Sequence, residues 1–190
     1  LIILELFKMV GESCLDYLVG PFTFVIYSHK TNKIFAARDH FGQRPFYFSK
    51  TDNFFIFSSD ANSILQMPGI KKSLNDSRII DYLVFQGSIE NQTFYKHILK
   101  LHRSELLLVD EKGLQIKVYF SFSPSLSKFQ SDEECFKKFR EIFIQVIDEI
   151  TDIGNKNIAS TCSGGLDSSA ISSVLHKLDK KSYEKLPKRK

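Results

Sequence analysis

The sequence predicts an α+β domain over residues 1–120, followed by the start of an α/β domain over residues 131–190. Short aromatic and β-branched runs separated by polar turns fill most of the first stretch, a pattern typical of strands. A serine-rich linker at residues 121–130 interrupts this pattern. Beyond the linker, apolar residues recur at helical spacing for about five turns, and a glycine-containing turn follows.

The elements of the first domain follow from local patterns. Strands are expected at residues 22–27, 33–37, 46–48, 54–58, 105–110 and 114–120. Helices are expected at residues 1–9, 15–18, 60–67 and 76–85. Asp60 is placed to cap the third of these helices, because its side chain can accept hydrogen bonds from the unpaired N–H groups of the first turn. The mixture of strands and a few helices predicts one β-rich layer structure.

The second domain is expected to open with a long amphipathic helix. Ser131 and Glu134 have the spacing of a capping box. The apolar stripe behind them consists of Phe136, Phe139, Ile142, Phe143, Val146, Ile147 and Ile150. We expect this stripe to pack against a parallel sheet. A β-prone run at residues 157–162 predicts a strand, and residues 167–177 predict a further helix, which together begin a doubly wound α/β domain.

The turn between that strand and helix is the segment Ser163-Gly164-Gly165-Leu166-Asp167-Ser168-Ser169, directly after Cys162. Glycines allow the backbone to approach an anion closely, and the first N–H groups of a helix have no intrahelical partner. Three serine hydroxyls add donors, and Asp167 can hold Mg²⁺ against phosphates. A plainer interpretation is a polar turn before a helix capped by Asp167 or Ser163.

This segment lacks the lysine of the Walker A pattern and resembles the PP-loop, SGGxDS, of enzymes that split ATP between the α and β phosphates. The resemblance implies ATP and Mg²⁺ as cofactors. The implied ATP- and pyrophosphate-binding residues are Cys162, Ser163, Gly164, Gly165, Leu166, Asp167, Ser168 and Ser169, with Asp167 as the metal ligand. Cys162 matches a position whose backbone lies near the adenine.

A second resemblance lies upstream. The segment from Ala37 to Phe48, ARDHFGQRPFYF, is similar to the RDxxGxxPLYY segment of asparagine synthetases. Residues 57–60 resemble the F-A-S-E that follows it in that family, and residues 18–24 resemble L-x-G-x-F-A-F. Residues 98–101 with Tyr119 are similar to the segment before the family's interdomain linker. Because these matches and the PP-loop occur in the family's order, the chain is identified as a member over about residues 1–178.

The resemblance implies that residues 1–120 are the C-terminal part of an Ntn-type (class II) glutamine amidotransferase domain. Residues 131–190 would begin a PP-loop ATP pyrophosphatase domain, which is adenine nucleotide α-hydrolase-like. Such enzymes release ammonia from glutamine and deliver it to aspartate that ATP has adenylated, with release of AMP and pyrophosphate. The implied partners are aspartate, glutamine or ammonia, and ATP, in a cytoplasmic homodimer.

The chain also departs from the family. The nucleophilic cysteine and the glutamine-binding segments of the family lie ahead of the region matched by Leu1, and its later ATP- and aspartate-binding loops lie beyond residue 190. We therefore expect a chain truncated at both ends, without a glutaminase nucleophile and with doubtful activity alone. Cys14 falls in the wrong place to substitute. On the plainer interpretation, Arg38 and Asp39 form an ion pair in a turn and are structural.

Two other functions remain open. Enzymes that close β-lactam or lasso-peptide rings resemble this family, and a residue other than cysteine after the initiator methionine would favour them. A non-catalytic remnant or binding module would be favoured if the chain failed to bind ATP with magnesium. The five histidines and three cysteines show no metal-ligand spacing, and the cysteines are typical of a reducing compartment. Neither a membrane-spanning run nor a clustered basic surface is present, and we interpret the basic end, residues 179–190, as a solvated tail rather than a nucleic-acid-binding patch.

Overall fold

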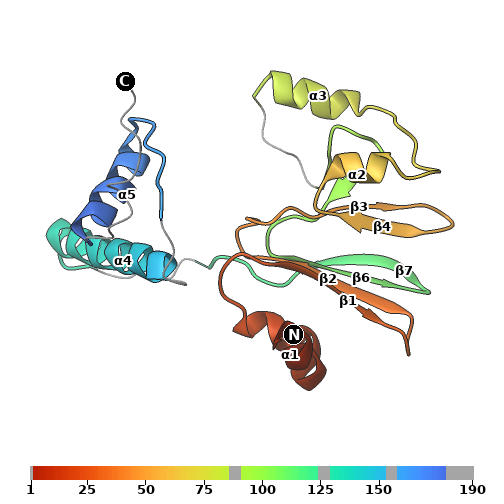
Figure 1. The fold of residues 1–190 in the computed structure, drawn as a ribbon, viewed down its shortest axis with the longest axis horizontal. Coiled ribbons are helices and arrows are strands. Elements are labelled where there is room, and N and C mark those ends of the chain that lie inside the picture. Colours follow the sequence, from red (N-terminus) through yellow and green to blue (C-terminus); the bar gives the residue numbers. More distant parts are fainter. Residues whose placement is uncertain (1, 86–90, 124–128, 153–157, 179–190) are drawn as a thin grey trace. The chain divides into compact units, whose positions relative to one another are not determined.

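The computed structural model describes residues 2–85, 91–123, 129–152 and 158–178. The chain forms two compact units, residues 1–123 and residues 124–190, which are described separately here (Figure 1). The basic tail and the first residue of the expected strand 157–162 lie outside the described residues. None of the described helices is long and apolar enough to cross a lipid bilayer.

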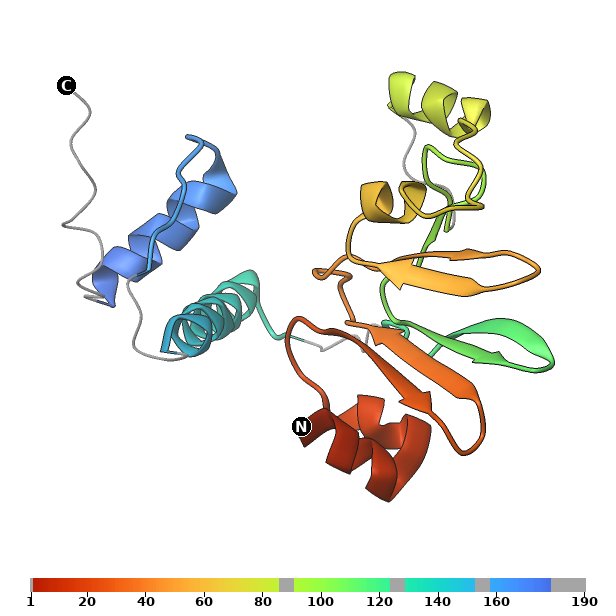
Figure 2. The ribbon, with the colours of Figure 1, turned by 45° about the vertical axis from the view of Figure 1, so that its right-hand side comes forward.

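Unit 1 contains two antiparallel sheets that lie between helices. The first sheet has the order β1-β2-β6-β7, formed by Thr23–Ser28, Lys33–Arg38, Glu105–Asp110 and Gly113–Val118. The second has the order β4-β3-β5, formed by Phe55–Ser58, Tyr47–Lys50 and Leu99–Lys100. Figures 1 and 2 show α1 (Ile2–Val10) outside the first sheet, and α2 (Ala61–Leu65) and α3 (Asp76–Leu83) outside the second. The order of layers is therefore helix, sheet, sheet, helix.

Apolar side chains on the two faces of β2 pack into two different layers of the hydrophobic core. Phe35 and Ala37 belong to the cluster shared with the helical N-terminal segment, which also buries Cys14 and Leu15. Ala36, between them, belongs to the cluster between the two sheets, with the buried residues Phe46, Phe48, Leu101 and Leu107. Successive side chains of a strand point to opposite faces, so this sequence buries both faces of β2. A third cluster under α2 contains Ile64, Leu65, Ile70 and Ile98.

Several expected elements of unit 1 are confirmed and others are shifted. Asp60 caps α2, and its carboxylate accepts from the N–H groups of Asn62 and Ser63 at 3.2 and 3.1 Å. The expected helix at residues 15–18 is instead a 3-10 helix, Gly11–Tyr17, that continues directly from α1. The last hairpin ends at Val118 rather than residue 120. The short strand β5 was not predicted, because two residues carry no detectable alternation.

Unit 2 contains two helices in its described part, α4 (Asp132–Asp152) and α5 (Leu166–Lys177). The capping box is half formed: Ser131 Oγ accepts from Glu134 N–H at 3.2 Å, while the Glu134 carboxylate accepts from Gln130 N–H at 2.8 Å. Ile147 on α4 and Leu175 on α5 are the buried apolar residues where the helices meet.

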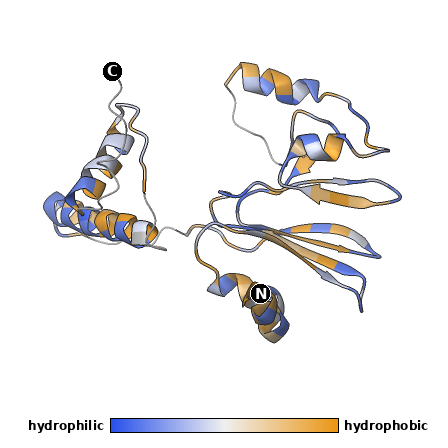
Figure 3. Cartoon of the chain, in the orientation of Figure 1, coloured by the Kyte–Doolittle hydropathy of each residue, from blue (hydrophilic) through white to orange (hydrophobic). Residues whose placement is uncertain are grey.

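One expectation for unit 2 is wrong over the described residues. Residues 158–162 do not form a strand, because a strand requires a hydrogen-bonded neighbour and the described part of this unit supplies none. That the apolar stripe of α4 packs against a parallel sheet stays a prediction, since the described part of unit 2 contains no sheet. The exposed members of the stripe are Phe136, Phe139, Ile142, Val146 and Ile150, and Figure 3 shows apolar and polar residues alternating along this helix.

Candidate functional site

The glycine turn connects an extended segment to the start of α5. Gly164 has a φ of +83°, which favours glycine, and Gly165 is the N-cap residue of the helix. Ser169 N–H donates to the carbonyl of Gly165 at 3.2 Å, which closes the first turn. No side chain caps the helix, so neither Asp167 nor Ser163 has the capping role that the plainer interpretation required. The uncapped N–H groups are therefore free to bind an anion.

Serine hydroxyls hold this turn in shape. Ser168 Oγ accepts from Ser163 N–H at 3.2 Å, lies 3.0 Å from Ser163 Oγ, and donates to the Gly165 carbonyl at 3.2 Å. A second hydroxyl pair, Ser160 Oγ and Ser172 Oγ at 2.9 Å, fastens the extended segment to the next turn of α5. The sequence had not indicated this pair. Together these bonds connect the loop and the segment before it to the first two turns of α5.

The backbone at Gly164 is open to its surroundings. A Cβ built on Gly164 would meet no atom within 4 Å, so the backbone is open to an approaching anion. Ser163, Leu166 and Asp167 are exposed, whereas Ser168 and Ser169 are partly buried against the helix. The predicted segment 162–169 is therefore exposed over residues 162–167 and contains backbone and hydroxyl donors.

Cys162 is the exposed residue directly ahead of the glycines. A hydrogen bond from the Gly164 backbone and a second from Ser169, whose Oγ lies 3.7 Å from the sulfur, lower the pKa of the Cys162 thiol. The same groups that stabilise a thiolate would stabilise other negative charge.

Asp167 is the single residue expected to hold magnesium. Asp167 lies in the first turn of α5 and is exposed. Among the described residues, no group of three or more histidine, cysteine, aspartate or glutamate side chains could form a metal site. Mg²⁺ is commonly held by one or two carboxylates together with substrate phosphates, so a single aspartate fits a metal that arrives with a nucleotide.

The Arg38–Asp39 segment has a different role from the expected ion pair. The Arg38 guanidinium donates to the carbonyls of Arg44, Leu101 and Gly42. The Asp39 carboxylate accepts from the N–H groups of Phe41 and Gln43, both at 3.0 Å, and of Arg44 at 3.1 Å. The two side chains therefore stabilise the turn through hydrogen bonds to backbone groups and do not pair with each other. Their role is structural, as expected, but it does not depend on an ion pair.

Burial and hydrogen bonding in this turn shift the pKa values of Asp39, Arg38 and Tyr119. Burial raises the pKa of the Asp39 carboxyl, yet its backbone N–H partners outweigh burial, and its pKa lies below the ordinary value. Burial lowers the pKa of the Arg38 guanidinium against the attraction of Asp39. Tyr119 Oη donates to the Arg38 carbonyl at 2.8 Å, and burial together with Asp39 raises the pKa of Tyr119 to about 12.

Cys14 has none of the properties of a nucleophile. It is fully buried in the core cluster next to α1, and burial together with the charge of Asp16 raises the pKa of its thiol. A reactive cysteine needs an accessible thiolate. The expectation that Cys14 does not substitute for the nucleophile therefore agrees with its surroundings.

Comparisons with known proteins agree with the resemblance to asparagine synthetases. A family model described as a glutamine amidotransferase domain matches residues 2–120. The chain is 30% identical over 164 residues to asparagine synthetase (glutamine-hydrolyzing) 3 of Bacillus subtilis strain 168, covering 86% of this chain and 26% of that protein. It is 28% identical over 177 residues to putative asparagine synthetase (glutamine-hydrolyzing) 2 of Methanocaldococcus jannaschii, covering 92% and 34%. It is 25% identical over 178 residues to asparagine synthetase (glutamine-hydrolyzing) 1 of Bacillus subtilis, covering 91% and 27%. The chain thus spans about a quarter to a third of the length of the curated relatives it matches.

Proposed function

Because the chain belongs to the glutamine amidotransferase domain family, we propose that it is a portion of a glutamine-dependent asparagine synthetase. In this proposal, unit 1 is part of an Ntn-type amidotransferase domain and unit 2 begins a PP-loop ATP-binding domain. The layer order of helix, sheet, sheet and helix supports the first assignment. The open glycine turn before α5 is the observation that carries the second.

The extent of the similarity supports treating the two units together. An alignment that covers 92% of the 190 residues as one stretch must include at least residues 17–174, wherever it begins. It therefore continues past residue 120, through the linker and across the glycine turn. The relative in that alignment carries the name of a glutamine-hydrolysing asparagine synthetase.

The proposed roles follow from the geometry of the turn. Backbone N–H groups at Gly164, Gly165 and the start of α5 receive the phosphates of ATP, and the hydroxyls of Ser163, Ser168 and Ser169 supplement them. The chain of hydroxyl bonds keeps these donors preorganised, so little reorganisation is needed when charge develops on the departing pyrophosphate. Cys162 contributes its backbone at the adenine side, and its thiol has no chemical role.

Asp167 is the proposed magnesium ligand. When bound, the ion would neutralise phosphate charge and assist departure of pyrophosphate. Since a single carboxylate is present, we expect metal affinity to depend on the nucleotide.

The proposed reaction is ATP-dependent amidation of aspartate, in which ATP adenylates the side-chain carboxyl and ammonia from glutamine displaces AMP. The substrates would be aspartate, glutamine or ammonia, and ATP. We place the protein in the cytoplasm, since its three cysteines are free thiols, and propose a homodimer as its assembly.

The test of the nucleotide site uses two glycines with matching backbone geometry. Gly164 and Gly20 both have positive φ, of +83° and +96°, and a Cβ at either would meet no atom within 4 Å. Gly164→Ala should weaken binding of ATP with Mg²⁺, measured by isothermal titration calorimetry, by about tenfold, because the loop must leave its left-handed conformation. Gly20→Ala, in unit 1, should leave binding unchanged. Absence of saturable ATP binding at millimolar concentration would overturn the nucleotide site.

The amidotransferase half is tested by the coding sequence on the upstream side. The proposal expects a cysteine directly after the initiator methionine of the whole protein, since the α-amine of that cysteine acts as its base. Any other residue there would contradict glutamine hydrolysis and would favour a ring-closing ligase.

A further inference from the structure

Unit 1 contains a pocket of about 550 Å³ whose lining includes none of the residues assigned to the proposed nucleotide site. Its lining residues include His40, Phe41, Arg103, Ser104, Phe120 and Phe122. Its volume is within the range of small-molecule sites, which are typically about 300–1,000 Å³. The phosphate loop lies in the other unit, so this pocket requires a separate explanation.

Aromatic rings form one side of the pocket. Phe120 lies 4.7 Å from His40 and 5.6 Å from Phe122 between ring centroids, and both pairs meet edge to face. Phe41 approaches Phe122 at 6.1 Å. Phe41 and Phe122 are nevertheless 62% and 74% exposed, which leaves most of each ring surface in water. Such rings offer a flat apolar ligand the stacking and edge contacts that aromatic pairs prefer.

The floor of the pocket is rigid. Ser104 is 6% exposed and has a φ of +58°, a left-handed conformation that residues other than glycine rarely adopt. Each of its polar groups is used: its N–H donates to Asp39 O at 3.0 Å, its Oγ to His40 O at 3.0 Å, and its carbonyl accepts from Tyr119 N–H at 2.9 Å. Backbone strain of this kind persists where surrounding contacts determine it, and it is frequent at binding sites.

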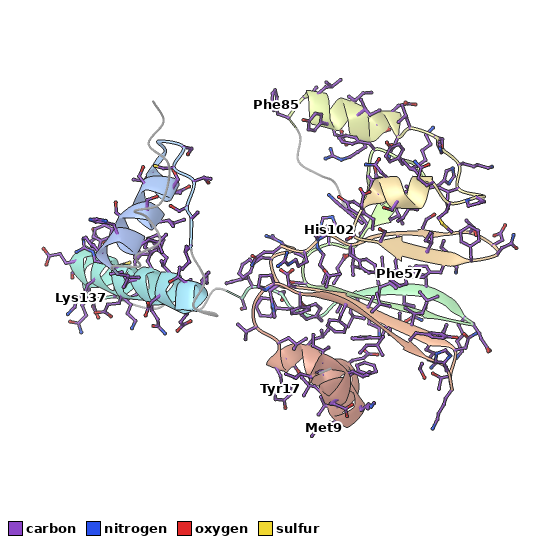
Figure 4. The ribbon with its side chains drawn as sticks, viewed as in Figure 1. Met9, Tyr17, Phe57, Phe85, His102 and Lys137 are labelled. Carbon is purple, nitrogen blue, oxygen red and sulfur yellow. The ribbon has the colours of Figure 1, made fainter. Side chains whose placement is uncertain are left out.

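The charge of the pocket is positive. Arg103 is the permanently charged residue among the described lining residues, and no aspartate or glutamate lines the pocket with it. Asp39 is not among the lining residues, and its ionised carboxylate is buried and accepts hydrogen bonds from three backbone N–H groups. Arg103 is exposed and follows His102, which Figure 4 labels in unit 1. An exposed arginine and several aromatic rings that line the same pocket match a ligand that combines a flat apolar body with a carboxylate.

We propose that this pocket binds a small aromatic carboxylate, with its ring against Phe120 and Phe122 and its carboxylate on Arg103. This ligand class goes beyond the proposed amidation, since neither aspartate nor glutamine carries a ring. A site of this kind in unit 1 would sense a metabolite unrelated to the reacting groups.

The test uses 3-phenylpropionate as the probe and 3-phenylpropanamide as its neutral isostere, both titrated into the full chain and followed by NMR. The acid should shift the backbone amides of residues 40, 41, 104 and 120–122 saturably. The amide should bind about tenfold more weakly, as should the acid to Arg103→Gln, because a hydrogen bond to a charged group is lost. Arg44→Gln, at an exposed arginine lining a different pocket, is the matched control and should bind as the parent does.

Two outcomes would overturn the proposal. The first is no saturable shift at those amides with up to about 10 mM acid, a concentration well above ordinary metabolite-site dissociation constants. The second is equal affinity for acid and amide in the parent chain, since a purely apolar pocket would then be indicated. The comparison of the two probes needs no variant, so it remains decisive if Arg103→Gln fails to fold.

Discussion

Replacing Asp39 by asparagine isolates the contribution of the turn that joins β2 to β3. The carboxylate is 1% exposed and accepts three backbone hydrogen bonds, two at Oδ1 and one at Oδ2. Asparagine has nearly the same shape. It keeps one acceptor oxygen for Phe41 and Gln43, but its NH₂ group then faces the N–H of Arg44. The substitution therefore changes charge and one hydrogen bond while leaving volume constant.

The expected loss follows from those contacts. One bond disappears and leaves a donor without a partner, which costs about 1–2 kcal/mol, and the two remaining bonds each lose about 0.5–1 kcal/mol when their acceptor becomes neutral. The total is about 2–4 kcal/mol at pH 7. Since domains of this size are stable by about 5–15 kcal/mol, the effect is easily measured.

Urea unfolding followed by far-UV circular dichroism is the appropriate assay, because the chain has no tryptophan. The pKa of Asp39 is lowered in the folded state, so its contribution is fully present above the ordinary aspartate pKa of about 4 and is lost as the pH falls through the folded value. The difference between parent and Asp39→Asn should shrink accordingly in acid. Asp52→Asn, at an exposed turn, is the control and should change stability by less than about 0.5 kcal/mol. A parent-like stability for Asp39→Asn at pH 7 would refute the reasoning.

Three further predictions follow from the same contacts. Gly42→Ala should destabilise unit 1 by about 1–3 kcal/mol in the same urea assay, because φ is +67° and the new Cβ would lie 3.2 Å from Arg38 Cζ; Gly11→Ala, with a similar φ and open space, should lose less. Iodoacetamide should modify Cys162 faster than Cys14, and the Cys162 reaction should accelerate at a lower pH than the reaction of an ordinary thiol does. Mass spectrometry after labelling at several pH values measures both rates, and equal rates for the two cysteines would contradict the burial of Cys14. Residues 125–190 alone should unfold without a cooperative thermal transition, since the apolar stripe of α4 is exposed; a sharp transition in calorimetry would refute this.

Local patterns were sufficient where one chemical signal dominates. Alternating aromatic residues located β1, β3 and β4, and Asp60 located the start of α2, because capping is decided within three residues. The glycine turn was likewise predictable, since two adjacent glycines after an extended run restrict the backbone strongly.

Features that depend on tertiary contacts were not predictable. The Arg38 and Asp39 side chains bind backbone groups up to 63 residues away, whereas their adjacency in sequence suggested that they pair with each other. Ser104 adopts a left-handed conformation with no glycine to indicate it, because its three hydrogen bonds come from residues 39, 40 and 119. The β-prone run at residues 158–162 is not a strand because propensity cannot supply the neighbouring strand that pairing requires.

The burial of both faces of β2 has a consequence for how this unit reaches its native state. A strand with one polar face resists sliding by one residue, since a slip would place charges in the core. Phe35, Ala36 and Ala37 offer no such penalty, because every one of them is apolar and buried. The register that pairs Ala36 with Leu107 must then be selected by side-chain volume. In this register the Phe35 ring lies on one face of β2 and the Ala36 methyl group lies on the other face. Substitutions that change side-chain volume in β2 should therefore favour misaligned, aggregation-prone folding intermediates. This should hold even where the native structure could tolerate the altered side chain.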